Sequence, residues 1–156
     1  MGPMLTGDDR FEPASFHILA LDYFRSAECI VSAQDQDALK LRFSYTVPYF
    51  LYTHSLELSF KAFLRARGVS KRELSSIRYR HNLEKLLDGC ITHGMHVTEH
   101  DAVVVRWLNS FMEDHAFRYL RPGFQFVPDV IDIRQACKAI SQTVGKVCKE
   151  IRNNVG

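Results

Sequence analysis

The sequence has little net charge and no long apolar run, and these two absences exclude several classes of protein. Its 20 Lys and Arg side chains against 18 Asp and Glu give a net charge of +2, which is too small to identify a charged partner. No window approaches the roughly 18–20 apolar residues that a membrane span needs. The first residues lack the basic start and apolar run of a secretory signal. We therefore expect a protein without a membrane span.

The sequence also lacks a metal-binding or disulfide pattern. Its four cysteines, at positions 29, 90, 137 and 148, form no CxxC pair and fall within helical apolar patterns, where cysteine behaves as a small hydrophobe. We predict reduced thiols in a cytoplasmic protein, with a disulfide framework as the alternative. His93, His96 and His100 lie across an expected helix end, without an HExxH motif. We therefore expect no metal and no other cofactor.

What the sequence does contain is helical periodicity over most of its 156 residues. Apolar residues recur at steps of three and four, and no segment alternates as a strand would. The main helices are expected at about 14–33, 47–67, 81–94, 98–112 and 132–155. This pattern predicts an all-α fold, an up-down bundle of four to five helices. Residues 1–13 are expected to be a flexible lead, and 14–156 a single domain.

Several residues have the character of helix ends. Ser15 is a candidate cap for the first helix, Gly68 is a suitable stop for the second, and Asp132 is a candidate cap for the last. The spacing from Ser70 to Glu73 is that of a capping box, so a short extra helix is expected there. The expected buried faces of the third and fourth helices hold Leu83, Leu86, Leu87, Cys90 and Ile91, and Val103, Trp107, Leu108, Phe111 and Met112.

The helix expected over 47–67 is apolar on nearly all of its circumference, which places it at the centre of the bundle. His54, Glu57 and Lys61 form a polar stripe on it, within roughly 60° of one another. A half-buried carboxylate needs a partner, and Lys61 at i+4 supplies one. The stripe is then either an ion pair beside a histidine or the wall of a binding groove.

Basic side chains concentrate in residues 61–85, which hold eight Lys and Arg against two Glu, or +6, while the rest of the chain holds twelve against sixteen, or −4. This suits a nucleotide or RNA phosphate, and the alternative is a solvated surface with extended basic side chains. Within this segment His81 is expected to face Glu57 from the start of the third helix, where backbone N–H groups favour an anion. The alternative is a helix-capping histidine.

The segment 114–130 has two prolines, a glycine and several aromatic residues, and we expect an ordered loop packed on the bundle. Arg118 and Arg121 flank a tyrosine in it, and arginine suits phosphate while tyrosine offers a stacking face. The alternative is that Pro122 and Gly123 simply form a turn.

Two of these segments together resemble the HEPN superfamily of helical domains. Members often carry an H-x-x-E-L-x-x-K-A-x-L helix followed by an H-[DN]-L-x-x-L helix. The matching residues here are His54, Glu57, Leu58, Lys61, Ala62 and Leu64, then His81, Asn82, Leu83 and Leu86. The stretch RYLRPGF is similar to an RYP-like loop of such proteins, and the resemblance spans about residues 14–152. It implies a helical bundle that commonly dimerises, and many members are metal-independent endoribonucleases.

The nuclease members carry an R-x4–6-H motif, and this sequence has that spacing only from Arg10 to His17, away from the family's position. We therefore predict a homodimeric, non-catalytic HEPN-like protein that binds a nucleotide, RNA or a partner protein. Its polar groove would hold His54, Glu57, Lys61, His81, Arg118 and Arg121. The alternative is a toxin-like ribonuclease that uses a displaced histidine such as His81 or His115.

Overall fold

The computed structural model describes residues 12–113 and 126–154, and every regular element in these ranges is an α-helix. The helices are α1 (Pro13–Asp35), α2 (Thr46–Ala66), α3 (Lys71–Leu74), α4 (Leu83–Thr92), α5 (Glu99–Glu113) and α6 (Val130–Asn154). The prediction of an all-α bundle is confirmed, with α3 as the short helix that the capping box predicts. Residues 1–11, which include most of the expected N-terminal lead, lie outside the described ranges.

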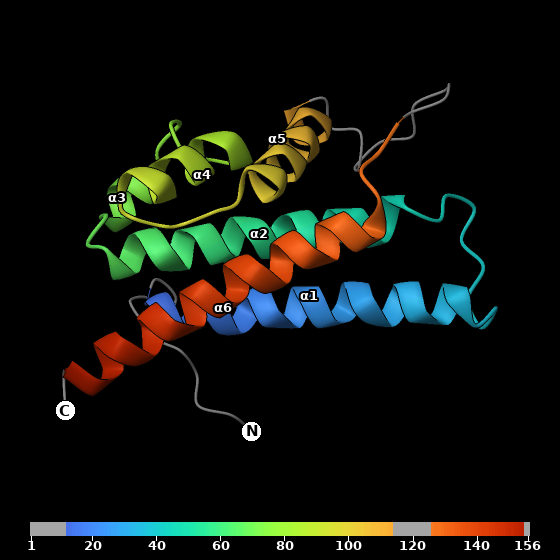
Figure 1. The fold of residues 1–156 in the computed structure, drawn as a ribbon, viewed down its shortest axis with the longest axis horizontal. Coiled ribbons are helices and arrows are strands. Elements are labelled where there is room, and N and C mark those ends of the chain that lie inside the picture. Colours follow the sequence, from blue (N-terminus) through green and yellow to red (C-terminus); the bar gives the residue numbers. More distant parts are fainter. Residues whose placement is uncertain (1–11, 114–125, 155–156) are drawn as a thin grey trace.

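Helix α2 lies at the centre of the bundle. It packs against α1, α4 and α6, and Figure 1 shows α1 along one side of it and α4 and α5 along the other, with α6 crossing the bundle. Its large apolar stripe is buried, including Tyr52, Phe60 and Leu64, each at 0% exposure. The same helix also buries Glu57 at 1% exposure. A carboxylate is therefore held in the middle of the fold.

A polar cluster fixes α2 between α1 and α6. Arg134 Nε donates to both oxygens of Glu28, at 2.7 and 2.9 Å, and the Tyr52 hydroxyl donates to the same carboxylate. Burial and the Glu28 carboxylate raise the pKa of Tyr52. Burial alone would raise the pKa of Glu28, but the hydrogen bonds from Tyr52 and Arg134 lower it. The three helices are thus joined by charge-assisted hydrogen bonds as well as by apolar packing.

Two of the four expected helix ends are confirmed, and two caps are corrected. The Ser70 side chain accepts from Glu73 N at 3.2 Å, and Gly68 follows α2 with φ of 90°. In contrast, α1 begins at Pro13 with no side-chain cap, so Ser15 lies inside the helix. Asp129, not Asp132, supplies the cap oxygen of α6, accepting from Ile131 N at 2.8 Å.

The buried faces of α4 and α5 differ from the expected ones at three positions. Ile91 is 44% exposed, Val103 is 57% exposed and Trp107 is 41% exposed. Helix α5 instead buries Asp101, Ala102, Val104, Val105, Leu108 and Asn109. Polar Asp101 and Asn109 occupy core positions because each has local partners, such as the Thr98 hydroxyl, which donates to Asp101 at 2.7 Å. The helix is therefore rotated from the orientation that its apolar residues alone predict.

Among the described residues, no helix combines the length and the apolar character needed to cross a membrane. The four cysteines are free thiols, and burial raises the pKa of Cys90, Cys137 and Cys148. A raised pKa keeps these thiols protonated and poorly nucleophilic. They therefore contribute to packing.

Candidate functional site

Three basic side chains converge on the buried carboxylate of Glu57. Lys61 Nζ donates to Glu57 Oε1 at 2.5 Å, which confirms the predicted pair one turn apart. His54 Nδ1 lies 3.7 Å from Glu57 Oε2, and His81 Nδ1 lies 3.3 Å from Glu57 Oε1. The prediction that His81 faces Glu57 is also confirmed. The four residues come from α2 and from the connection between α3 and α4, so they meet only in the folded chain.

The surrounding charges keep Glu57 ionised although it is buried. Burial would raise the pKa of its carboxyl group, but the hydrogen bond from His54, the charge and hydrogen bond of Lys61, and the charge of His81 together lower the pKa to about 2. An ionised, enclosed carboxylate can accept from several donors at once. Glu57 therefore fixes the positions of the three basic side chains around it.

His81 occupies a strained backbone position. Its φ is 52°, in the left-handed region that costs a residue with a Cβ about 1–3 kcal/mol. The next residue, Asn82, caps α4 by accepting from Lys85 N at 2.9 Å. The sharp turn between the two residues brings the imidazole of His81 to Glu57, while the side chain stays 49% exposed. Strain of this kind persists where the surrounding structure holds it in place.

Tyr79 anchors the connection that carries His81. The ring is 1% exposed and lies against Gly89 of α4, where an added Cβ would fall 2.9 Å from the Tyr79 hydroxyl oxygen. Only a glycine leaves room for this ring at that position. The close approach fixes Arg80 and His81, the two residues that follow, relative to α4.

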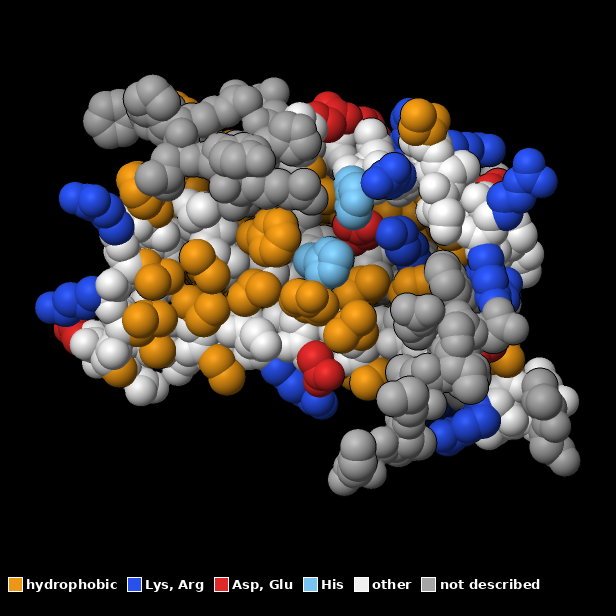
Figure 2. Space-filling view, turned by 180° about the vertical axis from the view of Figure 1, so that it is seen from behind, with side chains coloured by type: hydrophobic (Ala, Val, Ile, Leu, Met, Phe, Trp, Pro, Cys, Tyr) orange, Lys and Arg blue, Asp and Glu red, His pale blue; other side chains and the backbone are white. Residues whose placement is uncertain are grey.

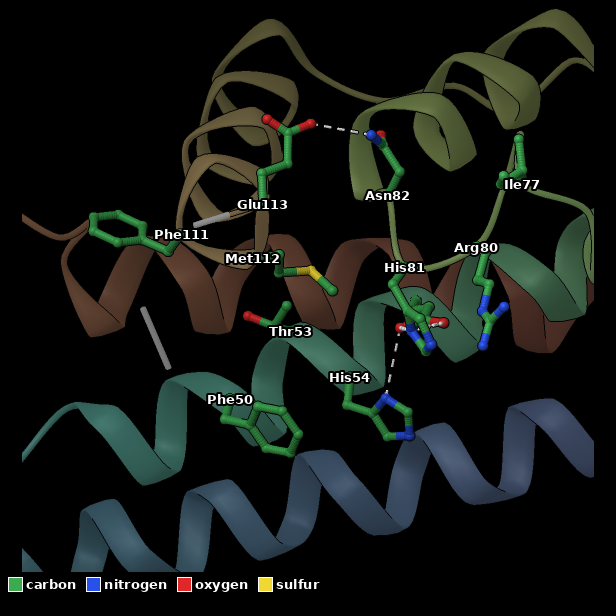
Figure 3. A pocket seen from close by; sticks show the side chains of 11 residues that line it. Phe50, Thr53, His54, Ile77, Arg80, His81, Asn82, Phe111, Met112 and Glu113 are labelled. Atoms are coloured by element: carbon green, nitrogen blue, oxygen red, sulfur yellow. Dashed lines mark hydrogen bonds and ion pairs between the residues drawn. The ribbon is translucent and has the colours of Figure 1, made fainter. Parts of the chain in front are cut away.

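A hollow of about 330 Å³ opens beside Glu57 (Figure 3). It lies between α2, the connection after α3 and the last turn of α5. Polar groups on its wall include Glu57 with His54 and His81, and apolar side chains on its wall include Phe50 and Met112. The volume is at the lower end of the range for small-molecule sites, about 300–1,000 Å³. Mixed walls of this kind suit a small ligand with a flat apolar part and a polar part.

Two features of the hollow suit a ligand: a pair of parallel aromatic rings and a buried hydroxyl group. The Phe50 and His54 rings are nearly parallel, with centroids 6.2 Å apart and 4° between their planes. The Thr53 hydroxyl is buried, with Thr53 only 2% exposed, and has no hydrogen-bond partner within the described part of the chain. Figure 3 shows Thr53 between Phe50 and Met112. An unpartnered buried hydroxyl costs about 1–3 kcal/mol, and a bound polar group would relieve that cost.

A second hollow of about 300 Å³ adjoins the first and shares Arg80 and His81 with it. Lys61 also lines it, and no acidic side chain is among its described lining residues. Arg80 forms no ion pair with any residue in the described ranges. Figure 2 shows Lys and Arg side chains next to histidine and acidic ones here, at the edge of a broad apolar area. The second hollow is therefore basic.

The structure brings together four of the six predicted site residues, namely His54, Glu57, Lys61 and His81. The other two, Arg118 and Arg121, lie outside the described residues, as does most of the expected loop at 114–130. The sequence patterns pointed to neither Thr53 nor Phe50 as a site residue. A polar residue between apolar positions of a central helix is the signal that points to Thr53.

The histidines at 93, 96 and 100 do not form a site. The His93 ring bonds to the Gly89 carbonyl at 2.8 Å and the His100 ring to Asp132 at 3.1 Å. No group of three potential metal ligands occurs in the described parts of the chain.

In comparisons with known proteins, the chain matches no family model, no curated protein and no solved structure.

Proposed function

We propose that the protein is a HEPN-like domain that binds a nucleotide or RNA without cleaving it. The observation that carries the proposal is the convergence of His54, Lys61 and His81 on buried Glu57, at the junction of an apolar and a basic hollow. An enclosed carboxylate that only balanced surface charge would be a costly arrangement. It is better explained as a fixed frame that orients basic groups toward a ligand.

The charge around the hollows supports an anionic ligand. Glu57 is already satisfied by its three partners, so it does not repel a second anion as a bare carboxylate would. Arg80 extends beyond this cluster and keeps its planar donor group for phosphate. The remaining acidic side chain of the first hollow, Glu113, accepts from Asn82 at 3.1 Å and from Asn109 at 3.0 Å.

The proposal includes a cytoplasmic homodimer. Its support is the broad apolar area that Figure 2 shows beside the histidine and acidic side chains of the site. Exposed large apolar side chains of α1 and α2 include Leu19 and Val47, each 46% exposed. Apolar side chains gathered on one face are typical of an association surface. The alternative to the homodimer is a different protein bound to the same apolar surface.

Fluorescence anisotropy with a labelled single-stranded RNA, at two salt concentrations, tests the proposal. Binding is expected to weaken with salt, because phosphate contacts release counterions. Arg80→Gln is expected to weaken binding and to reduce the salt slope by roughly 0.7 to 1. The control is Arg72→Gln, since Arg72 lies in the same basic segment and lines neither hollow. Equal loss in the two variants, or no binding at all, contradicts the proposal.

The second candidate function is a metal-independent ribonuclease, and one observation favours it. Nδ1 of both His54 and His81 faces Glu57, so the Nε2 atoms of the two rings are directed away from it. A pair of imidazoles oriented in this way can serve as general base and general acid. Incubating RNA with the protein in EDTA tests this candidate: cleavage that His81→Ala abolishes supports it, and intact RNA excludes it.

A further inference from the structure

We infer that the two adjoining hollows bind the two parts of a single nucleotide, the base in the apolar hollow and the phosphate in the basic one. This inference rests on the proposed function and assigns a ligand class to that same site. It is carried by three observations: a parallel pair of rings, and a buried hydroxyl and an arginine that have no side-chain partner within residues 12–113 and 126–154.

The base position follows from the apolar hollow. Phe50 and His54 both line this hollow with nearly parallel rings, and an aromatic ring offers a stacking face to a planar heterocycle. The Tyr23 ring contacts the His54 ring edge to face, with centroids 4.4 Å apart. Met112 lines the same hollow, and its flexible side chain adapts to a flat ligand.

The Thr53 hydroxyl then meets the edge of the base. It is the only lining group of the first hollow among the buried side-chain atoms that have no partner in the described residues. A hydroxyl donates and accepts, so it can pair with a ring nitrogen, an exocyclic amine or a carbonyl oxygen. A purely aliphatic ligand would leave this hydroxyl unsatisfied, which favours a heterocycle.

The phosphate position follows from the basic hollow. Arg80 and His81 line both hollows, so a ligand that spans them passes these two side chains. Lys61 uses one of its three donors on Glu57, which leaves donors for a phosphate oxygen. A single nucleotide unit has this division between a flat apolar end and an anionic end.

Calorimetric titration with adenosine 5′-monophosphate, adenosine and ribose 5-phosphate tests the inference. The nucleotide is expected to bind at least about tenfold more tightly than either half. Thr53→Val is expected to weaken nucleotide binding about fivefold, the loss of one hydrogen bond, and to leave ribose 5-phosphate unaffected. Phe50→Leu is expected to weaken it about tenfold through lost stacking. Phe43→Leu is the control, since Phe43 is 40% exposed and lines neither hollow.

Arg80→Gln is expected to weaken the nucleotide and ribose 5-phosphate alike, but not adenosine. If ribose 5-phosphate binds as tightly as the nucleotide, or if Thr53→Val and Phe50→Leu change nothing, the inference is overturned while phosphate or RNA binding stands. If none of the three ligands and no RNA binds, both the inference and the proposed function are overturned. Circular dichroism of each variant confirms that the fold is retained.

Discussion

His81 Nδ1 lies 3.3 Å from Glu57 Oε1, although 24 residues separate them in the chain. His81 reaches this position from a left-handed backbone conformation, and Glu57 reaches it from the interior of α2. The contact therefore joins a strained connection to the most enclosed helix of the bundle.

Glu57→Gln is expected to lower the free energy of unfolding at neutral pH by about 3 kcal/mol, because Lys61 would keep its buried charge without a charged partner. For a domain of this size the melting temperature would fall by about 10 °C. Thermal unfolding followed by circular dichroism measures the change. Glu73→Gln is a suitable control, since Glu73 is exposed and its ion pair with Arg78 spans 3.9 Å.

The stability of the protein is expected to fall as the pH drops from about 5 to about 2. The pKa of Glu57 is about 2 in the folded state against an ordinary value of 4.5, so the unfolded state binds the proton first. Ionised Glu57 thus contributes about 3 kcal/mol above pH 5, and this contribution is lost in acid. Urea unfolding at several pH values between 2 and 5 measures the free energy of unfolding and checks this loss. Glu57→Gln should flatten the dependence in part, because the lowered pKa of Glu28 acts in the same direction.

His81→Gly is expected to be more stable than His81→Ala by about 1 kcal/mol. Both variants lose the imidazole, but only glycine adopts a φ of 52° without strain. Urea unfolding of the two proteins side by side measures the difference. Equal stabilities would mean that residue 81 relaxes to an ordinary conformation once the contact with Glu57 is removed.

Thr53→Val is expected to raise the free energy of unfolding by about 1 kcal/mol, since it removes a buried hydroxyl that has no partner in the described structure. The same substitution weakens nucleotide binding if the hydroxyl serves the ligand. A gain in stability together with a loss of affinity is the pattern of a functional residue. A loss of stability would show that the hydroxyl has a structural partner.

Gly89→Ala is expected to weaken nucleotide binding, because the new methyl group displaces the Tyr79 ring and with it Arg80 and His81. An added Cβ would fall 3.0 Å from Tyr79 Cε1 as well as 2.9 Å from its hydroxyl oxygen, so the whole ring must shift. Gly145→Ala is the matched control: it also adds a methyl group to a helical glycine, next to His17 rather than the site. Similar affinity in both variants would contradict this role for Tyr79.

The helices and half of the site follow from local sequence patterns. The steps of three and four in α2 predict both its buried stripe and the pairing of Glu57 with Lys61, because neighbours on a helix are fixed by its geometry. The position of Thr53 in a hollow is different. The hollow at Thr53 depends on the distance between α5 and α2, and local sequence patterns do not determine how far apart two helices pack.

The wrong predictions, of buried positions in α5 and of the cap of α6, also concern features that local patterns do not determine. Val103 and Trp107 are apolar, so periodicity places them inside, yet Asp101 and Asn109 take the core positions through specific hydrogen bonds. Counting apolar residues does not anticipate such bonds. Similarly, the sequence pattern predicts Asp132 as the cap of the last helix, but α6 begins at Val130 and Asp129 caps it.

The enclosure of α2 has a consequence for how the protein could diverge or be redesigned. From Ser55 to Leu64, only Lys61 is not fully buried, so nearly any change there alters the core together with the cavity. Altered ligand preference would therefore arise most readily through the rim, at positions such as Ile77, Arg80 and Met112. Relatives with other ligands should share this part of α2 and vary around the opening.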